Sequence, residues 1–455
     1  MKQIGLKNTG IWAKEDGSRW KKYVYALIAA EISTTTEFCD ECIQIAPKQH
    51  DTGLLFEAIR AKTKSLVDNI DEIRNHRSEK EKRYAFLING NFNYLSDIQR
   101  QLQKLYKKLS RHSRLFIVVY NPFIGFFYSL ASWLSIRKAP KPDVYLTEKD
   151  LHTFAKLANY EVVRIRPSIF LPFYIPIISN FINSFFPILP FIRKFALVWL
   201  VVLRPILSEE TVPSLSIIIP ACNESGNIDA VIKRIPEFPK ADIEIIFIEG
   251  NSTDDTWECI QSEVKTPNKS FRIRAFKQPG KGKNDAVRVG FDNAKGELVT
   301  ILDAALTTPP EMLPLFYQAY NQGLGDFING SRLVYPMENE AMRSLNYMGN
   351  IFFSKILSWV LGLPISDSLC GTKLYPLLDY KRFILWREKF GDFDPFGDFE
   401  MLFAASELAL GVIDIPVQYR ARTYGKTKIN RLQDGLELSR MAVIGFFRVL
   451  LGKRK

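Results

Sequence analysis

Acidic side chains follow runs of apolar residues in the second half of the chain. Pro220 and Glu224 come after the first run, Glu249 ends the second, and Asp303 ends the fourth. If these runs are parallel strands, their carboxyl ends meet at one edge of a sheet, where ligands of such sheets bind. Carboxylates placed there can hold a base, a ribose and a divalent cation. We therefore expect one ligand site at these strand ends.

A basic turn follows the third apolar run. It reads Gly280-Lys-Gly-Lys283-Asn-Asp285. Its ammonium groups and exposed backbone N–H groups can meet phosphate. Each of these motifs alone is weak, but their order on successive runs is specific. Together they predict a phosphate-containing ligand beside Lys283 and Asp285.

The elements that must position these residues alternate along the chain. The apolar runs are short and rich in Ile, Val and Leu, as buried strands are, and helical patterns of about ten residues separate them. This alternation predicts an α/β unit with a mostly parallel, doubly wound sheet. The predicted strands are 215–219, 243–248, 272–276 and 298–302, and the predicted helices are 227–234, 255–265 and 284–294.

The first half of the chain shows a shorter pattern of the same kind. Residues 84–89 and 115–120 read as buried strands, with a helix at 96–110 between them. Residues 1–85 read as mostly helical with polar breaks. This half is therefore also predicted to be α/β.

The composition excludes several classes of protein. The chain has 455 residues, of which 47% are apolar and 24% charged, as in globular proteins and unlike disordered ones. Its 25 Gly and 24 Pro are too few for a fibrous protein, and a mean hydropathy of −0.06 excludes a polytopic membrane protein. Five Cys fit a reducing compartment, and the first 30 residues lack the pattern of a secretory signal. We expect a cytoplasmic location.

Positive charge is concentrated near the N-terminus. Residues 1–207 carry 31 Lys or Arg against 18 Asp or Glu, whereas residues 208–455 carry 30 against 31. This asymmetry predicts two domains, 1–207 and 208–455, with a linker near 204–215. A basic surface attracts an anionic membrane or nucleic acid. The densest basic stretch, 100–114, has apolar residues at helical spacing, so we interpret it as an amphipathic helix on its own domain, with a membrane-surface or nucleic-acid helix as the alternatives.

Two long uncharged stretches, 115–136 and 167–192, reach the length of a membrane span. The first is interrupted by Asn121-Pro122, and the second contains five prolines, which prevent a continuous helix. For the second stretch we expect contact with the membrane interface, with a buried core segment or a true span as alternatives. The C-terminal segment 441–455, apolar with a basic end, fits an interfacial helix or a short helix on the sheet. We therefore expect an anionic membrane surface as a partner, and no nucleic acid.

Residues 214–431 resemble family 2 glycosyltransferases of the GT-A fold, in particular bacterial relatives of dolichyl-phosphate mannose synthase that transfer sugars to polyprenyl phosphates. The segments that carry the resemblance are 216–224, 280–285, 301–311, Gly330-Ser-Arg332, Asp367-Ser-Leu-Cys-Gly-Thr-Lys373 and Arg422-Thr-Tyr-Gly-Lys-Thr-Lys428. They occur in the family order and cover nearly half of the chain.

The resemblance implies roles for particular residues. Its nucleotide base pocket would be lined by Pro220, Glu224 and Glu249. Asp303 would face the ribose, the diphosphate and a bound Mg²⁺ or Mn²⁺. Phosphate-binding residues on the acceptor side would be Arg332, Arg422 and Lys428, and Lys283 and Asp285 would bind the donor. A loop with Arg and Lys around Gly425 also suits a phosphate clamp, although an ordinary solvated loop has the same composition.

The sequence departs from the family pattern at the metal site. The family has Asp-X-Asp after the fourth strand, whereas this chain has Asp303-Ala-Ala305. One carboxylate compensates less of a cation's charge than two, so we expect weakened metal binding and impaired turnover. Glu249-Gly250 also replaces the usual Asp-Asp pair.

The catalytic base cannot be a histidine of the second half, because residues 208–455 contain none. The carboxylate candidates are Asp398 and Glu400, which share a face if the segment is extended. If the segment opens a helix, Asp398 is a candidate N-cap instead. A hydroxyl acceptor needs a base, whereas an ionised lipid phosphate does not. Asp398 is therefore the catalytic base only for a hydroxyl acceptor.

Residues 84–206 resemble the C-terminal half of an S-adenosylmethionine-dependent methyltransferase domain. The carrying segments are 85–90 with 95–99, 115–121, 146–151 and 159–163. The glycine-rich cofactor turn of such domains is missing from residues 1–83, whose glycines are isolated. We interpret this half as a degenerate, non-catalytic domain that supports the transferase or docks it on the membrane.

These observations predict an inverting glycosyltransferase that moves a sugar from a nucleotide-diphosphate sugar to a polyprenyl phosphate or another lipid-linked acceptor. It would work at the cytoplasmic face of a membrane, in the synthesis of a cell-envelope glycan. Two alternatives remain open. One is an inactive nucleotide-binding scaffold, disabled by Ala305. The other is a transferase to a glycan hydroxyl with Asp398 as base.

Overall fold

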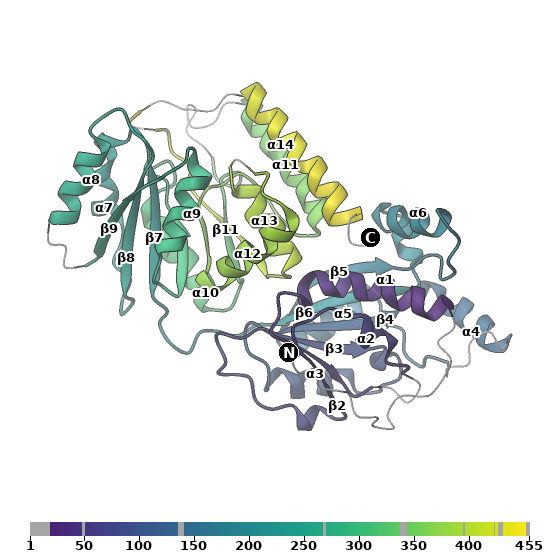
Figure 1. Cartoon of the computed structure of the whole chain (residues 1–455). Helices are drawn as coiled ribbons and strands as arrows, with labels where there is room; N and C mark the ends of the chain where they lie inside the picture. The colour runs from purple at the N-terminus through teal and green to yellow at the C-terminus, as the bar shows by residue number, and fades with distance from the viewer. Residues whose placement is uncertain are drawn as a thin grey trace. The chain divides into compact units, whose positions relative to one another are not determined.

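The computed structural model shows two compact α/β units, residues 1–206 with 450–455, and residues 207–449 (Figure 1). The structure describes residues 19–47, 51–134, 141–266, 270–336, 344–394, 396–422, 424–425 and 431–451. Each unit has its own sheet and its own apolar core. We call them unit 1 and unit 2.

Unit 1 contains a six-stranded sheet in the order β2-β1-β3-β4-β6-β5. The first four strands in this order are parallel, and β6 pairs antiparallel with both β4 and β5. Two of the strands, β1 and β2, lie in the region predicted to be mostly helical, so that prediction was wrong there. They are five and four residues long, too short for a reliable period. The strands are β1 (Glu41–Ile45), β2 (Lys64–Val67), β3 (Tyr84–Asn89), β4 (Arg114–Tyr120), β5 (Tyr160–Ser168) and β6 (Val198–Pro205).

The basic amphipathic helix of unit 1 packs on its own domain, as expected. Ile98, Leu102 and Leu105 of α3 are buried in the core, and Asp97 caps the helix by accepting a hydrogen bond from the Arg100 N–H. The helix ends at Tyr106, four residues before its predicted end. The helices of this unit are α1 (Arg19–Thr36), α2 (Leu54–Ala58), α3 (Ile98–Tyr106), α4 (Gly125–Trp133), α5 (Glu148–Leu157) and α6 (Ile178–Phe185).

The two long uncharged stretches fold as short elements. The first supplies β4, a 3₁₀ turn at Pro122–Ile124 and α4. The second supplies the end of β5, then α6 and a 3₁₀ turn at Phe186–Ile188. Among the residues that the structure describes, no helix has the length and apolar character needed to cross a membrane.

Unit 2 contains a seven-stranded sheet in the order β13-β11-β12-β10-β7-β8-β9. The strands β10, β7, β8 and β9 are parallel, whereas β12 runs antiparallel to β10 and β11. This confirms the predicted mostly parallel sheet and all four predicted strands. The strands are β7 (Leu215–Ala221), β8 (Ile243–Glu249), β9 (Arg272–Lys277), β10 (Leu298–Ile301), β11 (Phe327–Ser331), β12 (Lys373–Pro376) and β13 (Val412–Pro416).

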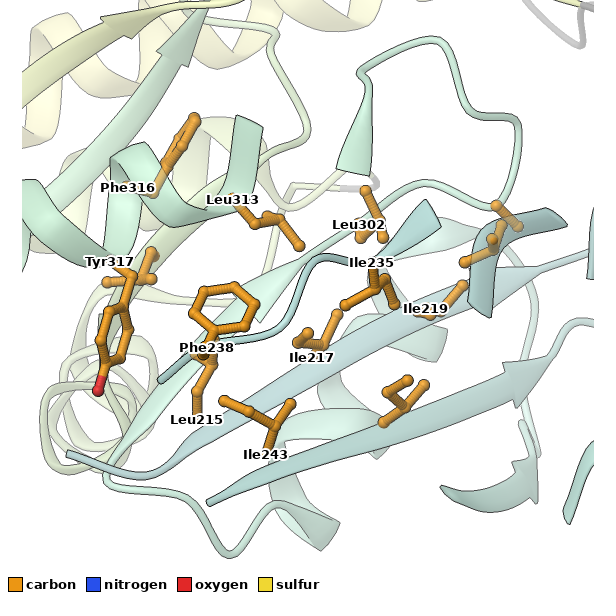
Figure 2. Close-up of a cluster of buried hydrophobic side chains, with 14 of the residues drawn as sticks. Leu215, Ile217, Ile219, Ile235, Phe238, Ile243, Leu302, Leu313, Phe316 and Tyr317 are labelled. Carbon is orange, nitrogen blue, oxygen red and sulfur yellow. The ribbon is translucent and has the colours of Figure 1, made fainter. Parts of the chain in front are cut away.

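Alternating side chains of β7 build the core on one face of this sheet. Figure 2 shows Leu215, Ile217 and Ile219 of this strand on the same side as Phe238 and Leu313. The period of two along the strand explains this shared face. The predicted helices of unit 2 are present as α7 (Ile228–Arg234), α8 (Thr256–Lys265) and α9 (Lys283–Asn293).

The remaining helices of unit 2 follow β10. They are α10 (Leu313–Asn321), α11 (Ser344–Leu361), α12 (Leu377–Phe390), α13 (Asp398–Glu407) and α14 (Arg431–Gly445). The C-terminal helix α14 lies along α11, and Figure 1 shows the two side by side. Its Met441 is buried, whereas Val443 is 54% exposed, so one side of the helix packs and the other faces out. The basic end, 452–455, lies outside the described residues.

The close approach of α9 to β7 depends on Gly290. A Cβ atom at this position would lie 2.2 Å from Cγ2 of Ile218, which is fully buried. A side chain here therefore forces the helix away from the strand that leads to Glu224. The helix also carries Lys283 in its first turn, so the packing of the helix on the sheet fixes the position of that lysine.

We predict that Gly290→Ala lowers the free energy of unfolding by about 1–3 kcal/mol, the usual effect of overpacking a core. Gly349→Ala is the matched control, because Gly349 lies in helix α11 and a Cβ there meets no atom within 4 Å. The control should be neutral or stabilising by up to about 1 kcal/mol. Urea unfolding of both variants measures the difference, and equal stability of the two would contradict this account.

Candidate active site

The predicted site residues gather at the carboxyl edge of the parallel strands. β10, β7 and β8 are neighbours in the sheet, and Asp303, Pro220 and Glu249 lie at or just beyond their ends. The prediction of a single ligand site relied on these strands being neighbours in the sheet.

Two loops at this edge are joined by hydrogen bonds. Asn223, with φ at 57°, accepts a bond from the Thr253 N–H at 2.7 Å. Asp254 accepts bonds from the Ser225 hydroxyl, 3.0 Å away, and from the N–H of Thr256. These bonds hold the loop after β7 against the loop after β8. Asp254 was not among the predicted site residues, and its place in the Ser/Thr/Asp-rich loop was the available signal.

Glu249 is buried at the end of β8, where its carboxylate accepts a bond from the Ser252 N–H. Asn251, two residues later, donates from its amide to the Gly280 carbonyl oxygen at 2.9 Å. The loop after β8 is therefore bonded to the basic turn as well as to the loop after β7. One hydrogen-bonded frame connects three of the predicted segments.

The basic turn places Lys283 against Asp303. Gly282 has φ at 87°, and α9 begins at the next residue. The Lys283 ammonium lies 2.7 Å from Oδ1 of Asp303, and both side chains are about one-third exposed, at 35% and 30%. Asp285, expected at the donor, accepts a bond from the Gly280 N–H at 2.9 Å and so shapes the turn itself.

The charges around this pair set its protonation. Burial alone would lower the pKa of Lys283, but the carboxylates of Asp303 and Asp398 outweigh it and raise the pKa to about 12. Burial would raise the pKa of Asp303, yet the cation of Lys283, with smaller contributions from Arg332 and Lys373, holds it below its usual value. The pair is therefore ionised at neutral pH.

Gly371 allows this ion pair to form. A Cβ there would lie 2.2 Å from the Lys283 ammonium nitrogen and 2.9 Å from Oδ2 of Asp303. The backbone at this glycine thus forms one wall of the pair. Gly371 belongs to the segment Asp367–Lys373, which was recognised by resemblance without a role for the glycine.

Two more cations of the site have their own carboxylates. Asp367 accepts two bonds from the Arg332 guanidinium, from Nε at 2.7 Å and from Nη2 at 3.0 Å. Lys373 is fully buried, and its ammonium lies 2.7 Å from Oδ1 of Asp398. Lys373 and Asp367 were not among the predicted functional residues. The run of polar residues from 367 to 373 after a helix was the signal that could have found them.

Arg422, expected at an acceptor phosphate, pairs with a carboxylate of the loop after β7. Its guanidinium lies 2.5 Å from Oε1 of Glu224, the residue assigned to the base pocket. The Tyr424 hydroxyl lies 2.9 Å from that of Ser225, and Gly425 has φ at 77°. The loop thus rests on the turn after β7. Lys428, the other predicted phosphate ligand, lies outside the described residues.

Asp398 lies in the first turn of α13, so the extended arrangement with Glu400 is not present. Gly397, with φ at 83°, occupies the N-cap position, and the alternative of Asp398 as N-cap is therefore also wrong. The Glu400 carboxylate forms ion pairs with Arg288 and Arg387, at 2.6 and 2.5 Å. Asp398 remains beside Lys373, and its negative charge also acts on Lys283, the partner of Asp303.

A buried carboxyl that sequence reasoning missed lies next to this helix. Asp394 accepts bonds from the N–H groups of Phe396 and Glu400, each at 2.8 Å. Burial raises the pKa of Asp394 to about 6, and the Asp398 carboxylate adds to the shift, while the N–H groups oppose it. Asp394 therefore changes charge in the physiological range, although its hydrogen bonds are structural.

A divalent cation at this site would have one carboxylate ligand from the protein, Asp303. Ala305 is buried and offers no ligand, and in the described part of the chain no three His, Cys, Asp or Glu side chains cluster as a metal site. Mg²⁺ is commonly bound by one or two carboxylates together with substrate phosphates. Asp303 therefore fits a cation that arrives with a diphosphate, and it does not fit one that the protein holds alone.

We predict that the Lys373–Asp398 pair stabilises unit 2 only as a pair. Lys373→Met should cost about 3 kcal/mol, because it leaves a buried carboxylate without its partner. Adding Asp398→Asn should recover most of that loss. Lys233→Met is the control, because its ion pair with Asp229 is exposed and should contribute little to stability. Denaturant unfolding of these three variants and of Asp398→Asn alone gives the comparison, and additive losses would contradict the pairing.

We predict a pH dependence that comes from Asp394. Its pKa is higher in the folded chain than its ordinary value of 3.8, so the folded state holds a proton that the unfolded state releases. Stability therefore falls as the pH rises from about 4 to about 6, by an amount on the order of 2 kcal/mol. Asp394→Asn should remove this slope, whatever constant loss it brings.

The control for this measurement is Asp392→Asn. The hydrogen bond from Arg288 lowers the pKa of Asp392, so this carboxyl contributes a slope of the opposite sign, at lower pH. Thermal unfolding between pH 4 and pH 7 compares the variants. An unchanged slope in Asp394→Asn would overturn the assignment.

Comparison with known proteins identifies unit 2. Residues 216–375 match the family model described as Glycosyl transferase family 2. A dolichyl-phosphate hexose transferase of Haloferax volcanii is 25% identical over 239 residues, which are 52% of this chain and 96% of that protein. An undecaprenyl-phosphate 4-deoxy-4-formamido-L-arabinose transferase of Edwardsiella ictaluri is 25% identical over 48% of this chain and 64% of its own length.

Solved structures with a similar arrangement were also found. Glucosyl-3-phosphoglycerate synthase from Mycobacterium tuberculosis, in complex with Mn²⁺, UDP and glucosyl-3-phosphoglycerate, is 17% identical, with a TM-score of 0.38 over 52% of this chain and 80% of that one. TarS of S. aureus, in complex with UDP-GlcNAc, is 15% identical, with a TM-score of 0.35 over 52% of this chain and 67% of that one. The family match and the named relatives confirm the predicted enzyme class. The chain therefore carries a glycosyl transferase family 2 domain, in residues 216–375, and is related to polyprenyl-phosphate sugar transferases.

Proposed function

We propose that unit 2 transfers a sugar from a nucleoside-diphosphate sugar to a polyprenyl phosphate or another lipid-linked acceptor, with inversion at the anomeric carbon. The observation that carries this proposal is the Lys283–Asp303 pair at the carboxyl edge of the parallel strands, next to the first turn of α9. The names of the relatives, which act on dolichyl and undecaprenyl phosphates, support the acceptor class.

The donor diphosphate would bind at the N-terminus of α9, beside the side chain of its first residue, Lys283. The helix presents backbone N–H groups there, and the N-cap residue Gly282 has no side chain to occupy them. Helix N-termini and ammonium groups both stabilise phosphate charge. Glu249 and Glu224, in the frame of hydrogen-bonded loops, would face the ribose and the base.

In the reaction, an oxygen of the acceptor forms a bond to the anomeric carbon as the bond from that carbon to the diphosphate oxygen breaks. The electron pair of the broken bond stays on the nucleoside diphosphate, so negative charge grows there. Lys283 is positioned to stabilise this charge, which is where preorganised cations contribute most to rate. Mg²⁺ or Mn²⁺, held by Asp303 and the diphosphate, would supply further neutralisation of the leaving group.

The surroundings of Asp398 favour a phosphate acceptor over a hydroxyl. Its carboxylate is in contact with the buried Lys373 ammonium, and the side chain is only 11% exposed. A general base must reach the proton that it removes, and this carboxylate is already engaged. An ionised lipid phosphate needs no base, so Asp398 serves here to hold Lys373 near the acceptor.

An enzyme with a lipid-linked acceptor must reach that acceptor at a membrane surface. We propose that the chain is peripheral to the cytoplasmic face, where an anionic surface attracts the positive charge of residues 1–207. Residues 84–206, with their resemblance to a methyltransferase domain, would act as support for the transferase.

Calorimetric titration with UDP and GDP, with and without Mn²⁺, tests the donor site. We expect one nucleotide to bind and Mn²⁺ to tighten its binding, because the diphosphate completes the coordination that Asp303 begins. Lys283→Met should weaken binding at least about tenfold, the value of one charge-assisted hydrogen bond. Lys281→Met, an exposed lysine of the same turn, is the matched control and should change affinity by less than about threefold.

The same titration separates the proposal from its main alternative. Binding of neither nucleotide by a folded sample would overturn the proposed donor site and the nucleotide-binding scaffold alike. Binding without sugar transfer would favour the scaffold, and Ala305→Asp would then be expected to raise turnover if the missing carboxylate is the cause.

A further inference from the structure

Unit 1 exposes a set of large apolar side chains on two neighbouring segments, 121–134 and 170–195. They include Phe126 at 72%, Phe127 at 63%, Trp133 at 79%, Ile177 at 82%, Phe181 at 55% and Phe191 at 84%. Soluble proteins rarely expose contiguous apolar patches of this kind without a partner. We call these two segments, with residues 19–30 of α1, the apolar face.

Hydrogen bonds hold the parts of the apolar face together. The Asn121 side-chain amide donates to the carbonyl oxygens of Lys194 and Ala196, at 2.5 and 2.6 Å. On the other side, Asn183 of α6 donates to the Tyr23 hydroxyl of α1 at 3.0 Å. The rings of Tyr23 and Tyr174 also meet edge to face, with centroids 5.4 Å apart. The face is therefore one built surface, with α1, α4 and α6 on the same unit (Figure 1).

Helix α6 has its polar side turned inward. Ser179 and Asn183 are fully buried. The Ser179 hydroxyl donates to the Phe173 carbonyl oxygen at 2.6 Å, and Asn183 accepts bonds from the N–H groups of Phe170 and Leu171. These bonds fix the orientation of the helix, so Phe181 must point outward. An ordinary surface helix in water has the opposite arrangement.

The charges of the apolar face have one sign. The segments 19–30, 121–134 and 167–197 contain no Asp or Glu. They contain five basic residues: Arg19, Lys21, Lys22, Arg193 and Lys194. Aromatic side chains next to Lys and Arg are typical of the boundary between lipid headgroups and acyl chains. A protein partner would require no such exclusion of acidic residues.

We propose that the apolar face docks onto an anionic lipid bilayer, with its aromatic side chains in the interface and its basic residues among the headgroups. The inward polar side of α6 and the single sign of charge carry this inference. It gives a role to residues 1–207 that is independent of any methyl transfer. It rests on the proposed function only in that a lipid-linked acceptor gives the docking a purpose.

Vesicle flotation of the full chain tests this docking without sugar donor or acceptor lipid. We expect the chain to float with vesicles of phosphatidylcholine and phosphatidylglycerol, and to float much less with phosphatidylcholine alone. Phe126→Ser with Phe181→Ser should weaken partition at least about tenfold, because two buried rings are lost from the lipid. Arg193→Gln with Lys194→Gln should weaken it by about fivefold per charge, and only for the anionic vesicles.

Leu315→Ser is the matched control, because Leu315 is 46% exposed on α10 of unit 2 and should leave flotation unchanged. Absence of flotation, or flotation that the paired phenylalanine variant does not reduce, would overturn the proposal. A stable dimer that the same variant converts to a monomer would also overturn it, by assigning the face to a second copy. Nucleotide titration of the same variants should be unchanged, so failure of docking and failure of the donor site are distinguishable.

Discussion

The balance of buried charge at the carboxyl edge of β10, β7 and β8 determines how unit 2 is built. Asp303 lies among the cations of Lys283, Arg332 and Lys373, which together keep its pKa low. Two of those cations must in turn be compensated, by Asp367 and Asp398. Removing a charge from water is costly unless a partner accompanies it. The antiparallel strand β12 begins at Lys373 and pairs with β10, so it brings the Lys373 ammonium to this edge of the sheet.

The same balance shows how the charge of Asp303 is compensated without a second carboxylate at position 305. With Ala305 in place of the second one, Lys283 takes the position of a counter-ion 2.7 Å from Asp303. The ammonium satisfies the carboxylate while no diphosphate is bound, and it is already placed for the phosphate charge that would replace Asp303 as its partner.

Much of the fold and part of the site could be predicted from the sequence. The runs at 215–219 and 243–248 are long, apolar and bounded by turn residues, and the sheet register then brings Glu249 and Asp303 to one edge. The strands β1 and β2 were missed because four or five residues do not define a period. Asp285 and Arg422 were given ligand roles by resemblance, and in the structure their side chains bond to Gly280 and Glu224. The pairing of Lys373 with Asp398 could not be predicted, because the two residues are 25 positions apart in the sequence.

Gly371 limits which residues the site can accept, although it has no side chain of its own. No functional group projects from this residue, yet its backbone lies where any side chain would displace the Lys283 ammonium. A survey of tolerated substitutions would thus find position 371 as restricted as the charged residues beside it. An engineer who wished to widen the site for a bulkier donor would gain nothing by changing this wall, because the room beside it is already filled by the ion pair. In the proposed donor site, the loops after β7 and β8 would be the place to make room for a bulkier donor.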